Sequence, residues 1–148
     1  MRKAIALVAI LAIALTACAD PGEEGASDPT ANAWVLEAGT LDGADIPIMD
    51  DHPITLVFNT EDGTAGGTSA CNQYFAAYTL SGSDLTFDDA GSTMMACEPP
   101  EVMDAEAAYL EALSLVELFT IEGDQLNLSG VDTDLVFVVD ETATTTTS

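Results

Sequence analysis

Basic residues are almost missing from this chain of 148 residues, which has two of them, Arg2 and Lys3, against 26 Asp and Glu and a formal net charge of −24. Nucleic-acid binding depends on cationic contacts to phosphates, so the composition excludes it as a function. Because Arg and Lys are so scarce, catalysis by an arginine clamp or a lysine Schiff base is excluded as well. So acidic a surface is typical of a protein in saline surroundings, where ions screen the charges. Selective binding of a divalent cation is the alternative interpretation.

Histidine is also scarce, because His52 in "MDDHPIT" is the only one in the sequence. His52, Asp50 and Asp51 together are a small donor set for a metal site. The spacing of the other acids does not follow the pattern of a calcium-binding loop. We therefore expect no catalytic residue, no metal and no cofactor. A calcium-binding surface module is the second interpretation, and a hydrolase that uses His52 with nearby carboxylates is the third.

A hydrophobic run long enough to span a bilayer is missing, since the longest one, residues 5–15, is too short. Arg2 and Lys3 precede this run, and Leu15-Thr16-Ala17-Cys18 follows it in the order of a bacterial lipobox. We expect residues 1–17 to be a lipoprotein signal peptide that is cut before Cys18, whose sulfur then carries a lipid. The mature protein would be extracytoplasmic, part of the cell envelope, and held at a bacterial membrane by its acyl chains.

Two segments of low complexity flank one candidate domain. Residues 18–32 are rich in Pro, Gly, Ser and acid and predict a lipidated, flexible tether, while the Thr-rich residues 140–148 predict a disordered tail. The segment between them, residues 33–139, is long enough for a single domain with one core. We expect the protein to be a monomer.

Inside that domain, apolar and polar residues mostly alternate, which predicts strands. The expected strands lie near residues 33–38, 54–59, 64–70, 75–80, 84–88, 91–96, 117–122, 125–129 and 134–139. Residues 98–119 break the alternation and predict one amphipathic helix with prolines at its start, with Met103, Ala107, Leu110 and Leu113 on one face. The fold class expected is mainly β with one α-helix packed against a small, curved antiparallel sheet or open β-barrel.

Cysteine is the last scarce residue type, with three in the chain. If Cys18 carries the lipid, Cys71 and Cys97 remain as an even pair in an oxidising compartment, which predicts a disulfide. A catalytic thiol would need a base or a positive field to lower its pKa, and this chain offers almost neither.

The order of several short segments resembles the META domain, also called the HslJ-like domain. These segments are "AWVLEAGTLDG" (33–43), "ITLVF" (54–58), "CNQYF" (71–75), "YTLSGSDLTF" (78–87) and "STMMACEPP" (92–100). The most specific parts are Cys71-Asn72 and Thr93-x-Met95-x-Cys97. Members of the family often have Arg at the positions of Gln73 and Met94, so an anion-binding role of those arginines is not expected here.

The resemblance implies a small mainly-β fold with a helix against an open barrel, and it brings no established catalytic residue. Family members are associated with heat-shock response and antibiotic resistance. We therefore expect a non-enzymatic, lipid-anchored envelope protein that acts in envelope maintenance or in stress or antibiotic tolerance. It would do so through contacts with an unidentified envelope protein or small ligand.

Overall fold

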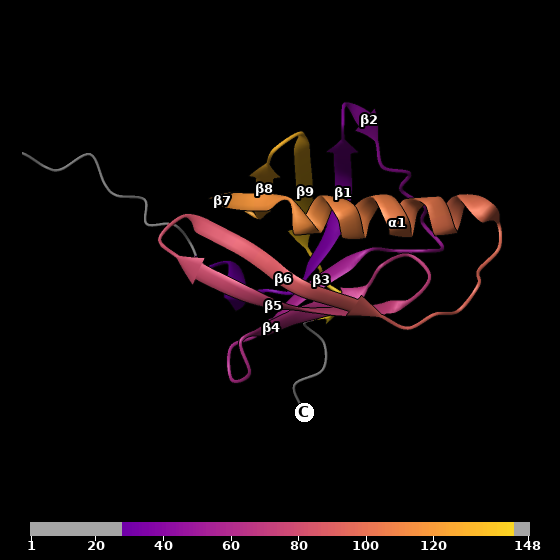
Figure 1. The fold of residues 1–148 in the computed structure, drawn as a ribbon. Coiled ribbons are helices and arrows are strands. Elements are labelled where there is room, and N and C mark those ends of the chain that lie inside the picture. The colour runs from indigo at the N-terminus through magenta and orange to yellow at the C-terminus, as the bar shows by residue number, and fades with distance from the viewer. Residues whose placement is uncertain (1–27, 144–148) are drawn as a thin grey trace, which may run out of the picture.

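Segments with alternating apolar and polar side chains form a closed antiparallel barrel in the computed structural model, which describes residues 28–143 (Figure 1). The strands are β1 (Trp34–Leu41), β2 (Ala44–Asp45), β3 (Thr55–Asn59), β4 (Thr64–Thr68), β5 (Gln73–Ser81), β6 (Asp84–Ser92), β7 (Val116–Glu122), β8 (Gln125–Gly130) and β9 (Thr133–Val139). Two helical segments accompany them, the 3-10 helix η1 (Pro29–Ala31) and the helix α1 (Pro100–Ser114). The fold class predicted from the sequence is confirmed, and the barrel is closed.

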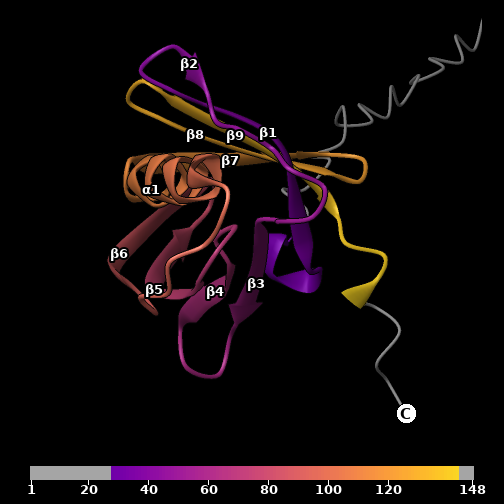
Figure 2. The same cartoon turned by 90° about the vertical axis from the view of Figure 1, so that its right-hand side faces the viewer.

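The barrel closes where β1 pairs with β9, from Trp34–Val139 at one end to Leu41–Thr133 at the other. β2 extends β1 outside this ring. Two of the strand pairings within the ring are short. β1 and β3 pair only at Trp34–Leu56 and Val35–Thr55, and the register of β6 with β7 contains the single pair Asp84–Leu118. Helix α1 connects β6 to β7 and packs against β6, β1 and β9 (Figure 2).

The core fills the barrel and the space beneath α1. Its largest fully buried side chains include Trp34, Tyr109 and Phe137. The helix buries Val102, Ala105, Glu106, Tyr109, Ala112 and Leu113. The predicted face of the helix is therefore wrong in part: Leu113 is buried, but Ala107 is exposed and Met103 and Leu110 are only half-buried. The observed buried face differs from the predicted one because it includes Glu106, a residue that the apolar pattern assigns to solvent.

Two buried tyrosines connect α1 to the sheet. The hydroxyl of Tyr74 donates a hydrogen bond of 2.8 Å to the carbonyl of Thr55, which leaves the hydroxyl of Tyr109, 2.6 Å away, to donate to Tyr74. Burial raises the pKa of both phenols above the ordinary value of 10.0. Both side chains are therefore neutral donors and acceptors inside the core.

The predicted strand at 91–96 is wrong, and the short strand β2 was not predicted. β6 continues to Ser92, with a bulge opposite the stretch between Phe75 and Ala77, and the chain then leaves the sheet in a non-strand segment, residues 93–97. Helix α1 is also shorter than the predicted range 98–119, because it ends at Ser114 and β7 begins at Val116.

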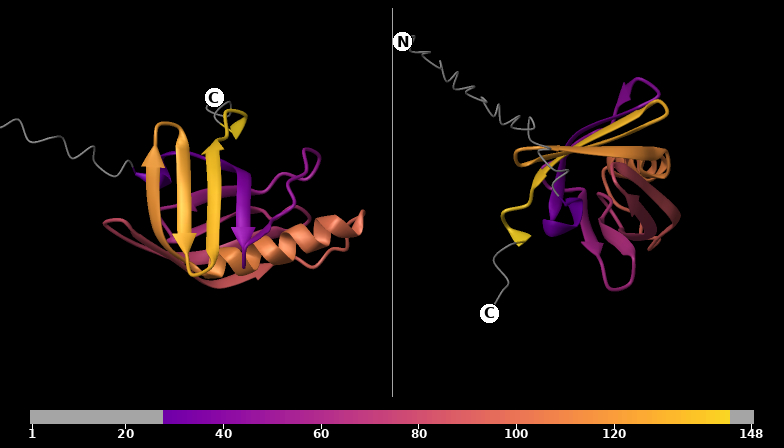
Figure 3. Two further views of the ribbon diagram at one scale, coloured as in Figure 1. Left: turned by 90° about the horizontal axis from the view of Figure 1, so that it is seen from above. Right: turned by 90° about the vertical axis from the view of Figure 1, so that its left-hand side faces the viewer.

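The first and last described segments lie side by side (Figure 3). The backbone N–H of Asp140 donates a hydrogen bond of 2.8 Å to the carbonyl of Ala33. Within the range predicted as a tether, Pro29–Ala31 form η1, and the indole N–H of Trp34 donates to the carbonyl of Pro29 at 2.7 Å. The predicted signal peptide (residues 1–17), Cys18 and residues 144–148 lie outside the described residues. Of the helices in residues 28–143, none has the length and hydrophobicity needed to cross a membrane.

Candidate functional site

Asn72 holds three separate segments of the chain together. Its side chain is buried, and its oxygen accepts hydrogen bonds from the backbone N–H of Met95 at 2.7 Å and from the hydroxyl of Thr93 at 2.9 Å. Its side-chain nitrogen donates to the carbonyl of Met95 at 3.2 Å and to Oε1 of Glu106 at 2.7 Å. The amide thereby uses all four of its hydrogen-bonding positions. Because it bonds both the N–H and the carbonyl of Met95, it takes the place of a neighbouring strand for that residue.

Glu106 is a carboxylate inside the domain, and the described residues 28–143 contain no Lys or Arg that could neutralise it. Its side chain is 6 % exposed. Its Oε1 accepts the hydrogen bond from Asn72 Nδ2 described above. Its Oε2 accepts two hydrogen bonds, from the backbone N–H of Asn72 and from the hydroxyl of Ser69, each at 2.7 Å. Burial acts to raise the pKa of Glu106, but these hydrogen bonds outweigh it and the pKa is lowered. The carboxylate is therefore ionised and held by dipoles alone.

The turn from Ser69 to Asn72 aims these donors at Glu106. The backbone N–H of Ser69 donates to the carbonyl of Asn72 at 2.8 Å and closes the turn. Within it, Ala70 has a φ of 79°, in the left-handed region that residues other than glycine rarely adopt. Such a conformation costs about 1–2 kcal/mol for an L-residue. The contacts of the turn with Glu106 offset that cost.

A disulfide joins the same turn to the segment after β6. Cys71 and Cys97 are bonded, with their Cα atoms 5.8 Å apart. The backbone N–H of Cys97 also donates to the sulfur of Met103 at 3.5 Å. The segment 93–97 is thus fixed at one end by the disulfide and in its middle by the side chain of Asn72.

A pocket of about 320 Å³ opens beside this fixed segment. Its lining residues are Asn72, Ser92, Thr93, Met94, Met95, Ala96, Met103 and Glu106, and we call it the methionine pocket. Met94 is 96 % exposed and Met95 58 %. In the described residues no buried side-chain N or O atom lacks a hydrogen-bond partner. What the pocket offers a ligand is therefore mainly thioether sulfur and apolar surface.

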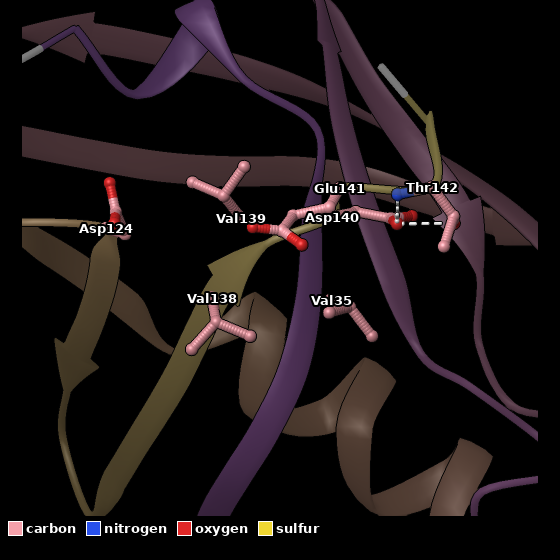
Figure 4. A pocket seen from close by; sticks show the side chains of 7 residues that line it. All are labelled: Val35, Asp124, Val138, Val139, Asp140, Glu141 and Thr142. Carbon is pink, nitrogen blue, oxygen red and sulfur yellow. Dashed lines mark hydrogen bonds between the residues drawn. The ribbon is translucent and has the colours of Figure 1, made fainter. Parts of the chain in front are cut away.

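A second, larger pocket of about 500 Å³ lies at the end of β9 (Figure 4). It is lined by Val35, Asp124, Val138, Val139, Asp140, Glu141 and Thr142. The carboxylate of Asp140 accepts hydrogen bonds from the N–H and the hydroxyl of Thr142, which lower the pKa of Asp140. This pocket contains none of the residues predicted as sites, so the methionine pocket is the better candidate.

His52 and its acidic neighbours lie elsewhere. His52 closes a turn with Met49, and its backbone N–H donates to the Met49 carbonyl at 3.1 Å. Asp50 and Asp51 are exposed, and neither they nor His52 line either of the two pockets. Across residues 28–143, no group of three or more His, Cys, Asp and Glu side chains could hold a metal ion.

The structure brings five of the residues singled out in the sequence into one place: Cys71, Asn72, Thr93, Met95 and Cys97. Sequence reasoning missed Glu106 and Ser69. A signal for Glu106 was present, because it stands in line with Val102, Tyr109 and Leu113 at the spacing of one helix face. A glutamate within an otherwise apolar stripe indicates a buried carboxylate that has partners.

Residues 28–142 match the META domain. The chain belongs to the META-domain family. One solved structure, an NMR structure of a protein from Burkholderia xenovorans, is 32% identical, with a TM-score of 0.63, and the match covers 74% of this chain and 82% of that one. The META fold seen here is therefore shared with a solved bacterial protein.

Two further structures share the fold at lower identity. One is an NMR structure of a protein, 22% identical with a TM-score of 0.57, matched over 74% of this chain and 90% of its own. The other is the crystal structure of a DUF4847 family protein from Bacteroides vulgatus, 12% identical with a TM-score of 0.53, matched over 76% of this chain and 94% of its own. No curated protein shows a significant match to this META-domain chain.

Proposed function

We propose that this META-domain protein is a non-enzymatic, lipid-anchored envelope protein whose methionine pocket binds an apolar, uncharged segment of a partner in the envelope. The exposure of Met94 carries the proposal. Its side chain is 96 % exposed although the segment that bears it is fixed by Asn72 and by the disulfide. Large apolar side chains exposed beside a pocket are typical of interaction sites, and flexible methionines suit surfaces that adapt to a ligand.

The chemistry of the pocket supports binding rather than catalysis. The carboxylate of Glu106 already accepts three hydrogen bonds. Its pKa is lowered, whereas a general acid needs a pKa raised toward neutrality. Cys71 and Cys97 are bonded to each other and supply no nucleophile. Each reactive group near the pocket thus has a structural role.

The charge distribution supports an uncharged partner segment. Residues 92–97, "STMMAC", contain no charged side chain, in a chain with 26 acids. Anionic partners would be repelled by the rest of the surface. A lipid at Cys18 followed by the tether would hold the pocket close to the membrane, which suits a role in envelope maintenance or stress tolerance.

Site-specific photo-crosslinking in the native host tests the partner site. A photo-crosslinking amino acid is incorporated at position 94 and, as a control, at position 49, which lies outside both pockets. We expect a defined adduct from position 94 only, and we expect Met95→Ser to abolish it while Met49→Ser leaves it unchanged. Identical adducts from both positions would refute the proposed site.

The anchor is tested separately. Metabolic labelling with a fatty acid should mark the wild-type protein and not the Cys18→Ala variant, and the variant should leave the membrane fraction. A variant that stays bound to membranes without a label would contradict anchoring through Cys18.

A further inference from the structure

We propose that the methionine pocket is also a binding site for a soft monovalent metal ion, Cu(I) or Ag(I), held by the thioether sulfurs of Met94, Met95 and Met103. All three residues line the pocket. The remaining methionine of the described residues, Met49, does not line it. This inference uses the same pocket as the proposed function but does not depend on a protein partner.

The donor type selects the metal. A thioether is a neutral, soft ligand, and soft sulfur ligands select Cu(I) over hard ions such as Mg²⁺ and Ca²⁺. Thiolates would compete for such a metal, but Cys71 and Cys97 are joined in the disulfide. The thioethers are therefore the sulfur donors that remain at this place in the fold.

The backbone brings the three sulfurs to one pocket. Met94 and Met95 are neighbours on the segment that Asn72 fixes through the N–H and the carbonyl of Met95. Met103 lies near the start of α1, and its sulfur accepts the N–H of Cys97, which directs it toward the same segment. The unbranched side chains of Met94 and Met95 are exposed and can rotate to close around an ion.

Electrostatics favour a monovalent cation here. The carboxylate of Glu106 lines the pocket, and no Lys or Arg follows Lys3 in the sequence. Its oxygens are occupied by three hydrogen-bond donors, so it contributes a negative potential rather than the open oxygen ligands that Ca²⁺ needs. A soft cation bound by neutral sulfurs beside this carboxylate fits both the negative potential and the lack of open oxygen ligands.

The test is an NMR titration of the full chain in detergent, with the methionine methyl groups labelled with ¹³C. Silver nitrate in chloride-free buffer is the probe, because Ag(I) needs no reductant and leaves the disulfide intact. We expect the methyl signals of Met94, Met95 and Met103 to shift together and to saturate at one equivalent, while the signal of Met49 stays in place. Equal shifts of the methyl signals of Met49 and the three pocket methionines would overturn the proposal.

Leucine variants separate the metal from apolar contact. Met→Leu removes the thioether but keeps an apolar side chain of similar volume. We expect Met95→Leu and Met103→Leu each to weaken Ag(I) binding at least tenfold, and Met49→Leu to leave it unchanged. Undiminished binding in both pocket variants would refute the metal site.

The variant Met95→Leu distinguishes the metal site from the partner site. The photo-crosslink from position 94 should survive Met95→Leu, since an apolar side chain remains. Loss of Ag(I) binding with the crosslink retained supports both the metal site and the partner site. A lost crosslink would refute the apolar partner contact at Met95, and undiminished Ag(I) binding would refute Met95 as a metal ligand.

Discussion

The substitution Glu106→Gln changes the hydrogen bonding at the centre of the site while keeping the shape of the side chain. The wild-type carboxylate accepts three hydrogen bonds, one on Oε1 and two on Oε2. A glutamine has one carbonyl oxygen and one NH₂ group, so at least one N–H of Asn72 would face another donor. Rotating the amide of Asn72 would not help, because its oxygen already accepts the N–H of Met95.

The size of the effect follows from these contacts. Hydrogen bonds to a charged group contribute about 1.5–3 kcal/mol each and neutral ones about 0.5–1.5 kcal/mol. Losing one charged bond and converting the others to neutral ones costs more than is recovered by no longer burying a charge. We expect Glu106→Gln to lower the free energy of unfolding by about 2–4 kcal/mol, and the melting temperature by at least roughly 6 °C.

Thermal and urea unfolding measure this change, and Glu111→Gln is the matched control. Glu111 lies on the exposed face of the same helix and carries the same charge. Its substitution is expected to change the free energy of unfolding by no more than about 0.5 kcal/mol. Equal melting temperatures for the two variants would refute the account of Glu106 as the carboxylate that holds the turn and the helix together.

Three further predictions concern the same region. The pKa of Glu106 is lowered in the folded state, so its stabilising contribution is fully present above the ordinary pKa of 4.5. The contribution is lost as the pH falls through the lower pKa of the folded state. The difference in melting temperature between wild type and Glu106→Gln should therefore shrink below about pH 4.5. A difference as large at pH 3 as at pH 7 would contradict this. Tyr74→Phe should cost about 1–2 kcal/mol in urea unfolding because two hydroxyl hydrogen bonds are lost, whereas Tyr78→Phe should cost less than about 0.5 kcal/mol. Replacing both Cys71 and Cys97 by serine opens a loop with a sequence separation of 26 and should cost about 3–4 kcal/mol; an unchanged urea midpoint would argue against the disulfide.

Most strands could be predicted because their pattern is local. In β9, Leu135 and Phe137 are buried and alternate with Asp134 and Val136, as the period of a strand requires. The predicted strand at 91–96 failed beyond Ser92, where β6 ends, because Met95 does not pair with a strand. The side chain of Asn72, more than twenty residues away in the sequence, bonds both backbone groups of Met95. An apolar pattern contains no information about such a partner.

The helix was predicted but its buried face was not, for a related reason. The pattern places every glutamate toward solvent, and Glu106 is stable in the interior only because Ser69 and Asn72 provide its donors. Those residues are 37 and 34 positions away in the sequence, so the compensation is a property of the folded chain. By contrast, the pairing of Cys71 with Cys97 required no geometry, since these two cysteines are the pair that remains once Cys18 is set aside as the predicted lipid site.

The pairing of β1 with β9 has a consequence for the order of folding. The barrel closes between Trp34 and Val139, so the first strand of the domain to emerge has to wait for the last one. β3–β6 form consecutive antiparallel neighbours and can assemble earlier, but β1 has only two register pairs with β3 to hold it in the meantime. Until Val139 emerges, β1 exposes an unpaired edge and the buried side of Trp34. The open edge of β1 and its apolar side are therefore covered only when the barrel closes.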